Sequence, residues 1–191
     1  LGLPDSLLGS AWPVMHADIG ASVSSAGIVT MIISAGTIVS ALSTNKLVSV
    51  MGTPVVTAIS VLLTAAAILA FSFATSFWQL CVFAVPYGLG AGAIDTSLNN
   101  FVAKHLSSRH MSWLHCCWGI GAMTGPYVMG YALTGAGGWH GGYRIIAAGA
   151  FGPSPGVVIF VAPRRQGGKS AAGGGKGEGG GVLAPPTISP Q

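Results

Sequence analysis

The segment YGLGAGAIDTSLNNFVAKH, residues 87–105, lies near the end of a long apolar run and contains Asp95, one of only four acidic residues in the chain. An isolated carboxylate in apolar surroundings costs several kcal/mol or more unless it is hydrated, paired or protonated. Which of these conditions Asp95 meets therefore bears on both the fold and the function of the protein.

The composition of the whole chain is typical of a membrane protein. Of its 191 residues, 51% are apolar and 6% are charged, whereas about a quarter of the residues in a soluble protein carry a charge. So few charges cannot cover a surface that faces water. The net charge of +4 does not indicate a nucleic-acid partner, because the basic residues are single or paired between apolar runs and form no stripe.

Helices that cross a bilayer core about 30 Å thick need roughly 20 apolar residues. Runs of about this kind, separated by polar breaks, occupy residues 1–15, 26–42, 54–74, 77–103, 111–133 and 143–162. We therefore predict an all-α membrane protein with six transmembrane helices in the lipid bilayer. The first run is short, which predicts a truncated first helix, and Pro153 and Pro155 predict a degenerate sixth helix.

The Lys and Arg residues of the loops predict the orientation, since cytoplasmic loops carry the excess of positive charge. Basic residues follow the second, fourth and sixth spans, and none follows the first, third or fifth. Only Arg144, at the outer edge of the last span, departs from this alternation. We therefore expect a multi-pass protein of the cell (plasma or inner) membrane with both termini in the cytoplasm. The unit would comprise residues 1–162, followed by a disordered Gly- and Pro-rich tail, 163–191.

The fourth span carries the first candidate functional residues. Gly88, Gly92, Asp95 and Asn99 share one helical face by their spacing. Small residues let a neighbouring helix approach closely, and polar residues on the same face then point into the bundle. Asp95 lies roughly 12 Å from the cytoplasmic end of the span by helical rise, and no Lys or Arg of any span lies at a similar depth. The pattern favours a substrate or proton pathway, with a structural cap or ion pair as the alternative.

Further polar residues extend this candidate site. Asn99 and Asn100 supply amide groups suited to a polyhydroxylated solute, with a structural role for one of them as an equal alternative. Asp5, which lies between Pro4 and Pro13, is the second acid of the membrane region. If the first span extends further at its N-terminus, Asp5 becomes an interior residue, and two carboxylates facing one cavity would form a coupled proton site. The alternative is that Asp5 caps the start of a helix.

The fifth span contains His115, whose imidazole is suited either to relaying protons or to hydrogen-bonding a neighbouring helix. Cys116 and Cys117 follow it directly, but consecutive helical residues diverge by about 100° and do not converge on one ion, so we expect no metal site. Trp12 lies near the end of the first span, which is typical of an interfacial belt residue, and stacking on a sugar ring is the alternative.

Enzyme and cofactor motifs do not occur in the sequence. It contains no GxSxG elbow, no HExxH pair and no GxxxxGK[ST] phosphate loop. The glycines that precede Asp95 belong to a membrane run and do not follow a soluble strand. We therefore expect neither an enzyme nor a bound cofactor.

Three segments carry a resemblance to a known family: LGLPDSLLGSAWPVM, GLGAGAIDTSLNNFVAKH and HCCWGIGAMTGPYVMGY. They resemble the N-terminal six-helix half of a major facilitator superfamily transporter, and more narrowly the fucose permease and glucose/fucose/proton symporter branch. The resemblance covers roughly residues 1–148. It implies a 3+3 inverted-repeat fold and proton-coupled symport of a sugar or similar polar solute. It also implies that Asp5 and Asp95 couple protons and that Asn99 binds the sugar.

Some features keep other functions open. Gly121, Gly125 and Pro126, expected with Gly88 and Gly92 to pack helices together, are similar to the fifth-helix motif of drug/proton antiporters. The loop between the second and third helices has Asn where the superfamily usually has Asp. Such transporters have two six-helix halves, so the resemblance implies a missing C-terminal half as a partner. A non-transporting membrane fragment or scaffold is the remaining alternative.

Overall fold

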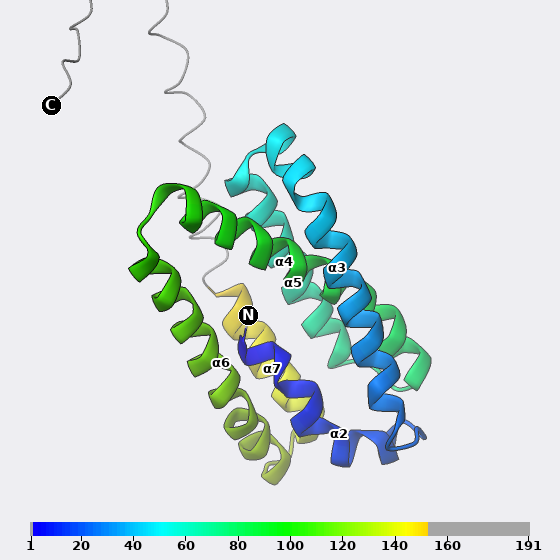
Figure 1. The fold of residues 1–191 in the computed structure, drawn as a ribbon. Helices are drawn as coiled ribbons and strands as arrows, with labels where there is room; N and C mark the ends of the chain where they lie inside the picture. Colours follow the sequence, from blue (N-terminus) through cyan, green and yellow to red (C-terminus); the bar gives the residue numbers. More distant parts are fainter. Residues whose placement is uncertain (1, 153–191) are drawn as a thin grey trace, which may run out of the picture.

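The computed structural model describes residues 2–152, and over this range every regular element is a helix, which confirms the predicted all-α class. The elements are α1 (Gly2–Asp5), α2 (Leu7–Asp18), α3 (Ser25–Met51), α4 (Thr53–Phe71), α5 (Phe77–His105), α6 (Ser108–Thr134) and α7 (Gly138–Phe151) (Figure 1). The predicted disordered tail and residues 153–162 of the predicted sixth span lie outside the described residues.

Three of the described helices are long and apolar enough to cross a membrane. These are α3, α4 and α5, with mean hydropathies of 1.8, 2.3 and 1.4. Helix α6 has the length, 27 residues, but Gly, Ser, Tyr and His residues dilute its apolar side chains. Helix α2 and the described part of α7 are shorter, at 12 and 14 residues. The arrangement of six transmembrane helices stays a prediction.

The connection between α3 and α4 is shorter than the sequence predicts. The predicted second span ends at residue 42, but α3 continues to Met51, so Lys46 belongs to a helix and not to a loop. Hydropathy marks the apolar part of a helix, whereas the helix itself continues into polar residues that water can hydrate. The chain turns at Gly52, whose φ of 83° lies in the left-handed region that glycine adopts without strain.

Helix α7 begins at Gly138, earlier than the predicted start at residue 143. Its first turn is attached to two other helix ends: the Trp139 indole donates to Asp18 at 2.7 Å, and His140 Nδ1 lies 2.8 Å from the carbonyl oxygen of Ser72. Arg144 therefore lies inside a helix, with its guanidinium 5.3 Å from the ring centroid of Phe73. Arg144 is the residue that departs from the loop charge pattern, and this cation–π contact with Phe73 stabilises its charge.

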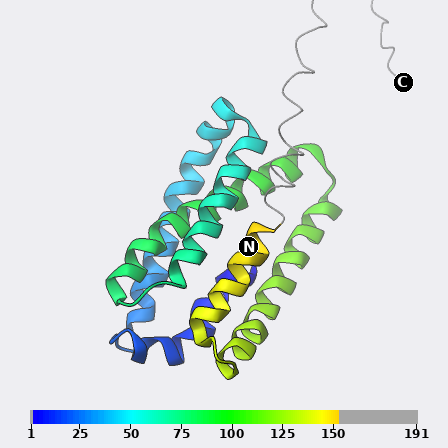
Figure 2. The same cartoon turned by 180° about the vertical axis from the view of Figure 1, so that it is seen from behind.

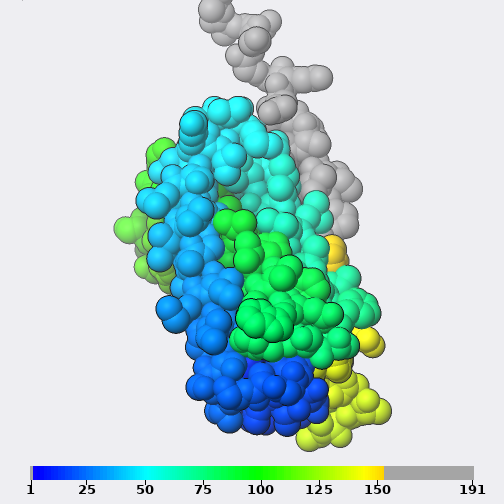
Figure 3. Space-filling model, turned by 90° about the vertical axis from the view of Figure 1, so that its right-hand side faces the viewer, coloured from blue at the N-terminus to red at the C-terminus, as the bar shows by residue number. Residues whose placement is uncertain are grey.

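The helices pack in two groups. Helix α5 packs along α3 and α4, whereas α6 packs along α1, α2 and α7. The view from behind in Figure 2 shows α7 beside α4, where the two groups meet. Figure 3 shows the long flank of α3 against α5. The largest fully buried apolar side chains are Trp139, Leu7, Met15, Ile68, Leu80, Met129 and Val29. The core therefore lies toward the N-terminal half of α5 and reaches Tyr87.

The α3–α5 contact depends on two of the predicted packing glycines. A Cβ atom at Gly88 would meet the carbonyl oxygen of Ile33, and one at Gly92 would lie 2.6 Å from the carbonyl oxygen of Thr37. The hydroxyl of Thr37 donates to the Gly88 carbonyl at 3.3 Å, and that of Ser40 donates to another α5 carbonyl at 2.6 Å. Because Gly88 and Gly92 have no side chain, the backbone of α5 lies within hydrogen-bonding reach of α3.

The α1–α6 contact is built in the same way. A Cβ atom at Gly121 would lie 3.0 Å from the backbone nitrogen of Leu3, and one at Gly125 would lie 2.7 Å from its carbonyl oxygen. Pro126, the third predicted packing residue of this helix, is exposed within α6. The close approach between these helices therefore depends on the glycines and not on the proline.

Candidate functional site

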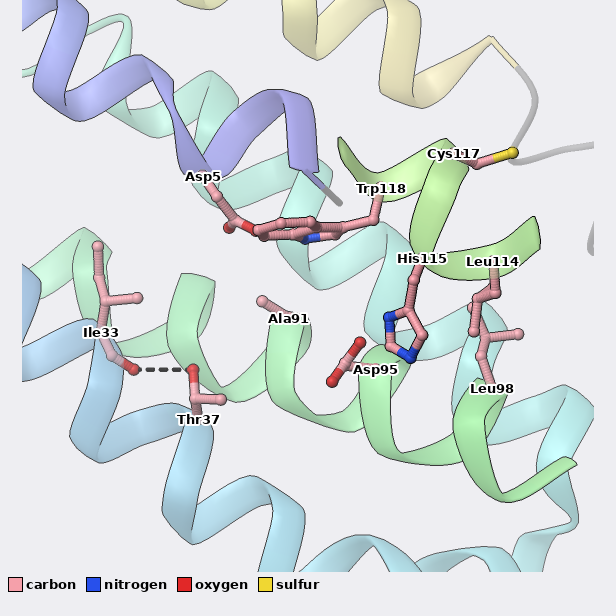
Figure 4. Close-up of a pocket in the computed structure, with 10 residues that line it drawn as sticks. All are labelled: Asp5, Ile33, Thr37, Ala91, Asp95, Leu98, Leu114, His115, Cys117 and Trp118. Atoms are coloured by element: carbon pink, nitrogen blue, oxygen red, sulfur yellow. Dashed lines mark hydrogen bonds between the residues drawn. The ribbon is translucent and has the colours of Figure 1, made fainter. Parts of the chain in front are cut away.

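A cavity of about 470 Å³ lies between the two groups of helices, and we call it the Asp95 cavity. Its polar lining consists of Asp5 from α1, Thr37 from α3, Asp95 from α5 and His115 from α6 (Figure 4). The remaining lining is mostly apolar. Three residues that the sequence singles out for proton or solute binding thus share one cavity, although they come from three different helices.

The Asp95 carboxylate has no hydrogen-bond or ion-pair partner among residues 2–152. It is exposed to the cavity, and the imidazole of His115 points toward it from α6 (Figure 4). Of the three conditions open to an acid in apolar surroundings, pairing with a cation is therefore excluded within the described part of the chain. Hydration or protonation remains, and both leave this carboxyl group accessible to a solute or a proton.

The rotation of α5 turns some of its residues toward α3 and others, including Asp95, toward the cavity. Gly88 and Gly92 face α3, whereas Ala91 and Leu98 line the cavity. Asp95 lies on the boundary between these two stripes of the helix. The single polar face predicted for α5 is therefore two adjacent faces, one for packing and one for the cavity.

Two aromatic donors hold Asp5. The Tyr87 hydroxyl donates to Oδ1 at 2.6 Å, and the Trp118 indole donates to Oδ2 at 3.3 Å. Each carboxylate oxygen thus has a neutral donor, and no Lys or Arg within residues 2–152 forms an ion pair with Asp5. These contacts join α1 to α5 and α6, so the side chain of Asp5 connects helices and does not cap a helix start.

Tyr87 and Trp118 were not predicted as site residues. Helical spacing carries a signal for both: Tyr87 precedes Asp95 by two turns on α5, and Trp118 follows His115 at i+3 on α6. The sequence alone does not distinguish such aromatic residues from ordinary core or lipid-facing residues. Their partner, Asp5, lies more than eighty residues away from each of them in the chain.

We predict that Tyr87→Phe lowers the free energy of unfolding by about 1.5–3 kcal/mol, because it removes the donor of a hydrogen bond to a carboxylate. Unfolding in mixed detergent micelles measures the change. Tyr131→Phe is the matched control, since Tyr131 is 79% exposed, and this variant should leave stability unchanged. Equal stability of the Tyr87 variant and the original protein would contradict the prediction.

The two predicted amide ligands lie outside the lining of the Asp95 cavity. Asn100 Nδ2 donates to Asn45 Oδ1 at 2.8 Å, which ties the end of α5 to α3. The Oδ1 atom of Asn99 is buried and has no hydrogen-bond partner among residues 2–152. Neither Asn99 nor Asn100 lines this cavity, and a solute contact for either residue stays a prediction. For Asn100, the contact with Asn45 matches the structural alternative.

Trp12, the remaining predicted solute ligand, is 5% exposed and donates its indole N–H to the carbonyl oxygen of Val23 at 2.8 Å. Its ring packs in the hydrophobic core and does not line the Asp95 cavity. Trp12 therefore presents no ring face to a solute in this cavity, and its interfacial position stays a prediction. The physical reason is that the chain after α2 folds back over the ring and supplies its hydrogen-bond acceptor.

Comparison with known proteins agrees with this architecture. The chain matches the family model of the Major Facilitator Superfamily over residues 1–187, which includes the whole helical bundle and the cavity. A comparison with curated proteins gives no match. The family implies transport of a solute across a membrane, in accord with the apolar helices α3, α4 and α5. The chain belongs to the major facilitator superfamily of membrane transporters.

Proposed function

We propose that this chain forms the N-terminal six-helix half of a proton-coupled symporter for a sugar or similar polar solute. The observation that carries the proposal is the Asp95 carboxylate, which has no partner within residues 2–152 and lies on a cavity that Asp5 and His115 also line. An ionisable group inside a membrane bundle is expensive, and such groups typically belong to substrate or proton pathways. The fucose permease branch rests on the sequence resemblance of the first, fourth and fifth spans.

The helix contacts support a 3+3 inverted repeat. A Cβ atom at Gly36 of α3 would lie 3.3 Å from the backbone of the Gly–Leu pair 88–89 of α5. A Cβ atom at Gly121 of α6 would lie 3.0 Å from the backbone of the Gly–Leu pair 2–3 of α1. In the proposed repeat, α1 corresponds to α5, and α3 corresponds to α6. Helices α4 and α7, which contact each other, complete the two sets of three.

This register relates residues on the two sides of the Asp95 cavity. Asp5 stands three residues after Gly2, and Ala91 stands three residues after Gly88; both line the cavity. Ile33 stands three residues before Gly36, and Trp118 stands three residues before Gly121. Both residues also line the cavity. A position between structural repeats is where secondary transporters bind their solute and coupling ion.

In the proposed cycle, protonation of Asp95, shared with Asp5, neutralises the cavity and permits the protein to rock between inward-open and outward-open states. His115, pointing at Asp95, relays the proton. The missing C-terminal half supplies the opposite wall of the solute pathway. The unit lies in the plasma or inner membrane with its N- and C-termini in the cytoplasm, as the loop charges predict.

A drug/proton antiporter is the second candidate, favoured by the apolar part of the lining. The carboxylate of Asp95, which has no partner in the described part of the chain, shares this lining with Ile33, Leu98, Leu114 and Trp118. Such a pocket suits a lipophilic cation, because the apolar walls bind its body and the carboxylate attracts its charge. A fragment that transports nothing is the third possibility.

Proton movement in lightly buffered suspensions of native cells distinguishes these functions. A symporter makes the medium more alkaline when L-fucose or D-glucose is added, because protons enter with the sugar. An antiporter gives no response to the sugars but exports ethidium when the cells are energised. Cells that produce the Asp95→Asn variant are the control. The absence of both responses would count against symport of these sugars and export of ethidium, and would favour the fragment.

A further inference from the structure

A second cavity, of about 420 Å³, lies on the other side of Asp5. Its polar lining includes Thr30, Tyr87 and Tyr143, and we call it the Tyr143 cavity. Asp5 and Ile33 line this cavity as well as the Asp95 cavity. Asp5 is therefore a shared wall, with its carboxylate between the two spaces.

The register of the two repeats pairs two residues that line the Tyr143 cavity with two residues that line the Asp95 cavity. Gly9 stands as far after Gly2 as Asp95 stands after Gly88, so these two residues correspond. Thr30 stands as far before Gly36 as His115 stands before Gly121, so these two also correspond. Ser6, between α1 and α2, keeps helical φ and ψ of −85° and −10°, so the count continues across it. The Asp95 cavity holds the acid and the imidazole, and the Tyr143 cavity holds their counterparts, a bare glycine and a hydroxyl.

Apart from the shared Asp5 carboxylate, the polar side chains that line the Tyr143 cavity carry neutral hydroxyl groups. Tyr143 is 3% exposed, yet its hydroxyl has no hydrogen-bond partner within residues 2–152. This hydroxyl can therefore donate to a group placed in the cavity. The Thr30 hydroxyl donates to Ala26 at 3.0 Å and can still accept. The cavity thus offers an unused donor and an unused acceptor.

We propose that the Tyr143 cavity is a second binding site, which takes one neutral hydroxylated solute molecule. The Tyr143 hydroxyl donates to a solute oxygen, and the Thr30 hydroxyl and the Asp5 carboxylate accept from solute hydroxyls. Phe71 and Tyr87 supply aromatic walls for its C–H faces. The volume lies within the usual range for small-molecule sites. This second site rests on the proposed function. The solute occupies the Tyr143 cavity, the proton occupies the Asp95 cavity, and Asp5 contacts both.

Two cysteine reporters test this division in the purified full chain. Cys81, Cys116 and Cys117 are first replaced by Ser, and Thr30→Cys or Thr37→Cys then places one thiol in the Tyr143 or the Asp95 cavity, respectively. We expect L-fucose or D-glucose to slow the reaction of Thr30→Cys with N-ethylmaleimide. Adding Tyr143→Phe should raise the sugar concentration needed for protection about five- to tenfold, as expected for the loss of one hydrogen bond. Tyr131→Phe is the matched control and should change nothing.

A blocking variant makes the test independent of Tyr143. Gly9 lines the Tyr143 cavity, and a Cβ atom there would meet nothing within 4 Å, so Gly9→Val has room to fold. It should abolish protection of Thr30→Cys by occupying the cavity. Protection of Thr37→Cys without protection of Thr30→Cys would overturn the second site and leave the proposed function standing. Protection of neither reporter would overturn both. Undiminished protection in both the Gly9→Val and the Tyr143→Phe proteins would also overturn the second site.

Discussion

Asp95→Asn should abolish the accumulation of solute driven by a pH gradient while leaving solute exchange intact. The amide keeps the size and the hydrogen-bonding capacity of the side chain but neither binds nor releases a proton. A gradient of one pH unit drives up to about tenfold accumulation for one coupled proton, and the variant should reduce this ratio to about one. Exchange of labelled for unlabelled solute needs no net proton movement, so its rate should be retained.

Native membrane vesicles in which the variant replaces the original chain provide the measurement, because any partner half is then present. Uptake of labelled L-fucose or D-glucose is followed with an imposed pH gradient and, separately, with unlabelled solute inside. Asp18→Asn is the matched control, since Asp18 lies at the end of α2, accepts from Trp139 and does not line the Asp95 cavity. It should keep uphill uptake. Uphill uptake in the Asp95 variant would count against the proposed coupling.

Gly88→Ala should destabilise the bundle by about 1–3 kcal/mol, the usual cost of forcing an extra methyl group into a packed contact. The new Cβ atom would meet the Ile33 carbonyl oxygen and lie 3.1 Å from two further backbone atoms of that residue. Because these are backbone atoms, no side-chain rotation relieves the clash, and α3 and α5 must move apart. The Thr37 hydrogen bond to the Gly88 carbonyl would weaken with them.

The matched control is Gly119→Ala on α6, where a Cβ atom meets nothing within 4 Å. Both substitutions add one methyl group to a glycine inside a long helix, so they share the gain in helix propensity of about 1 kcal/mol. Unfolding of the two variants in mixed micelles separates the steric effect from that gain. If Gly88→Ala proves as stable as Gly119→Ala, the close α3–α5 contact is not what holds this part of the bundle together.

The sequence was informative about the helices because membrane helices are selected by local composition. Long apolar runs and few charges predicted an all-α membrane protein, and the family match supports membrane transport. Boundaries were predicted less well, as at Lys46, because a helix continues beyond its apolar part. Trp12 shows the same limit for single residues: its place near a span end did not reveal that the following loop covers its ring.

For the candidate site, the sequence by itself determined which residues are chemically unusual. Asp5, Asp95 and His115 stand out because ionisable groups are rare and expensive in apolar runs. Only the tertiary structure decided that they share a cavity, that Tyr87 and Trp118 hold Asp5, and that Asn99 and Asn100 lie outside the lining. The physical reason is that these contacts depend on how far each helix rotates and how closely its glycines let it approach a neighbour. Both quantities are set by contacts between segments that are distant in the chain.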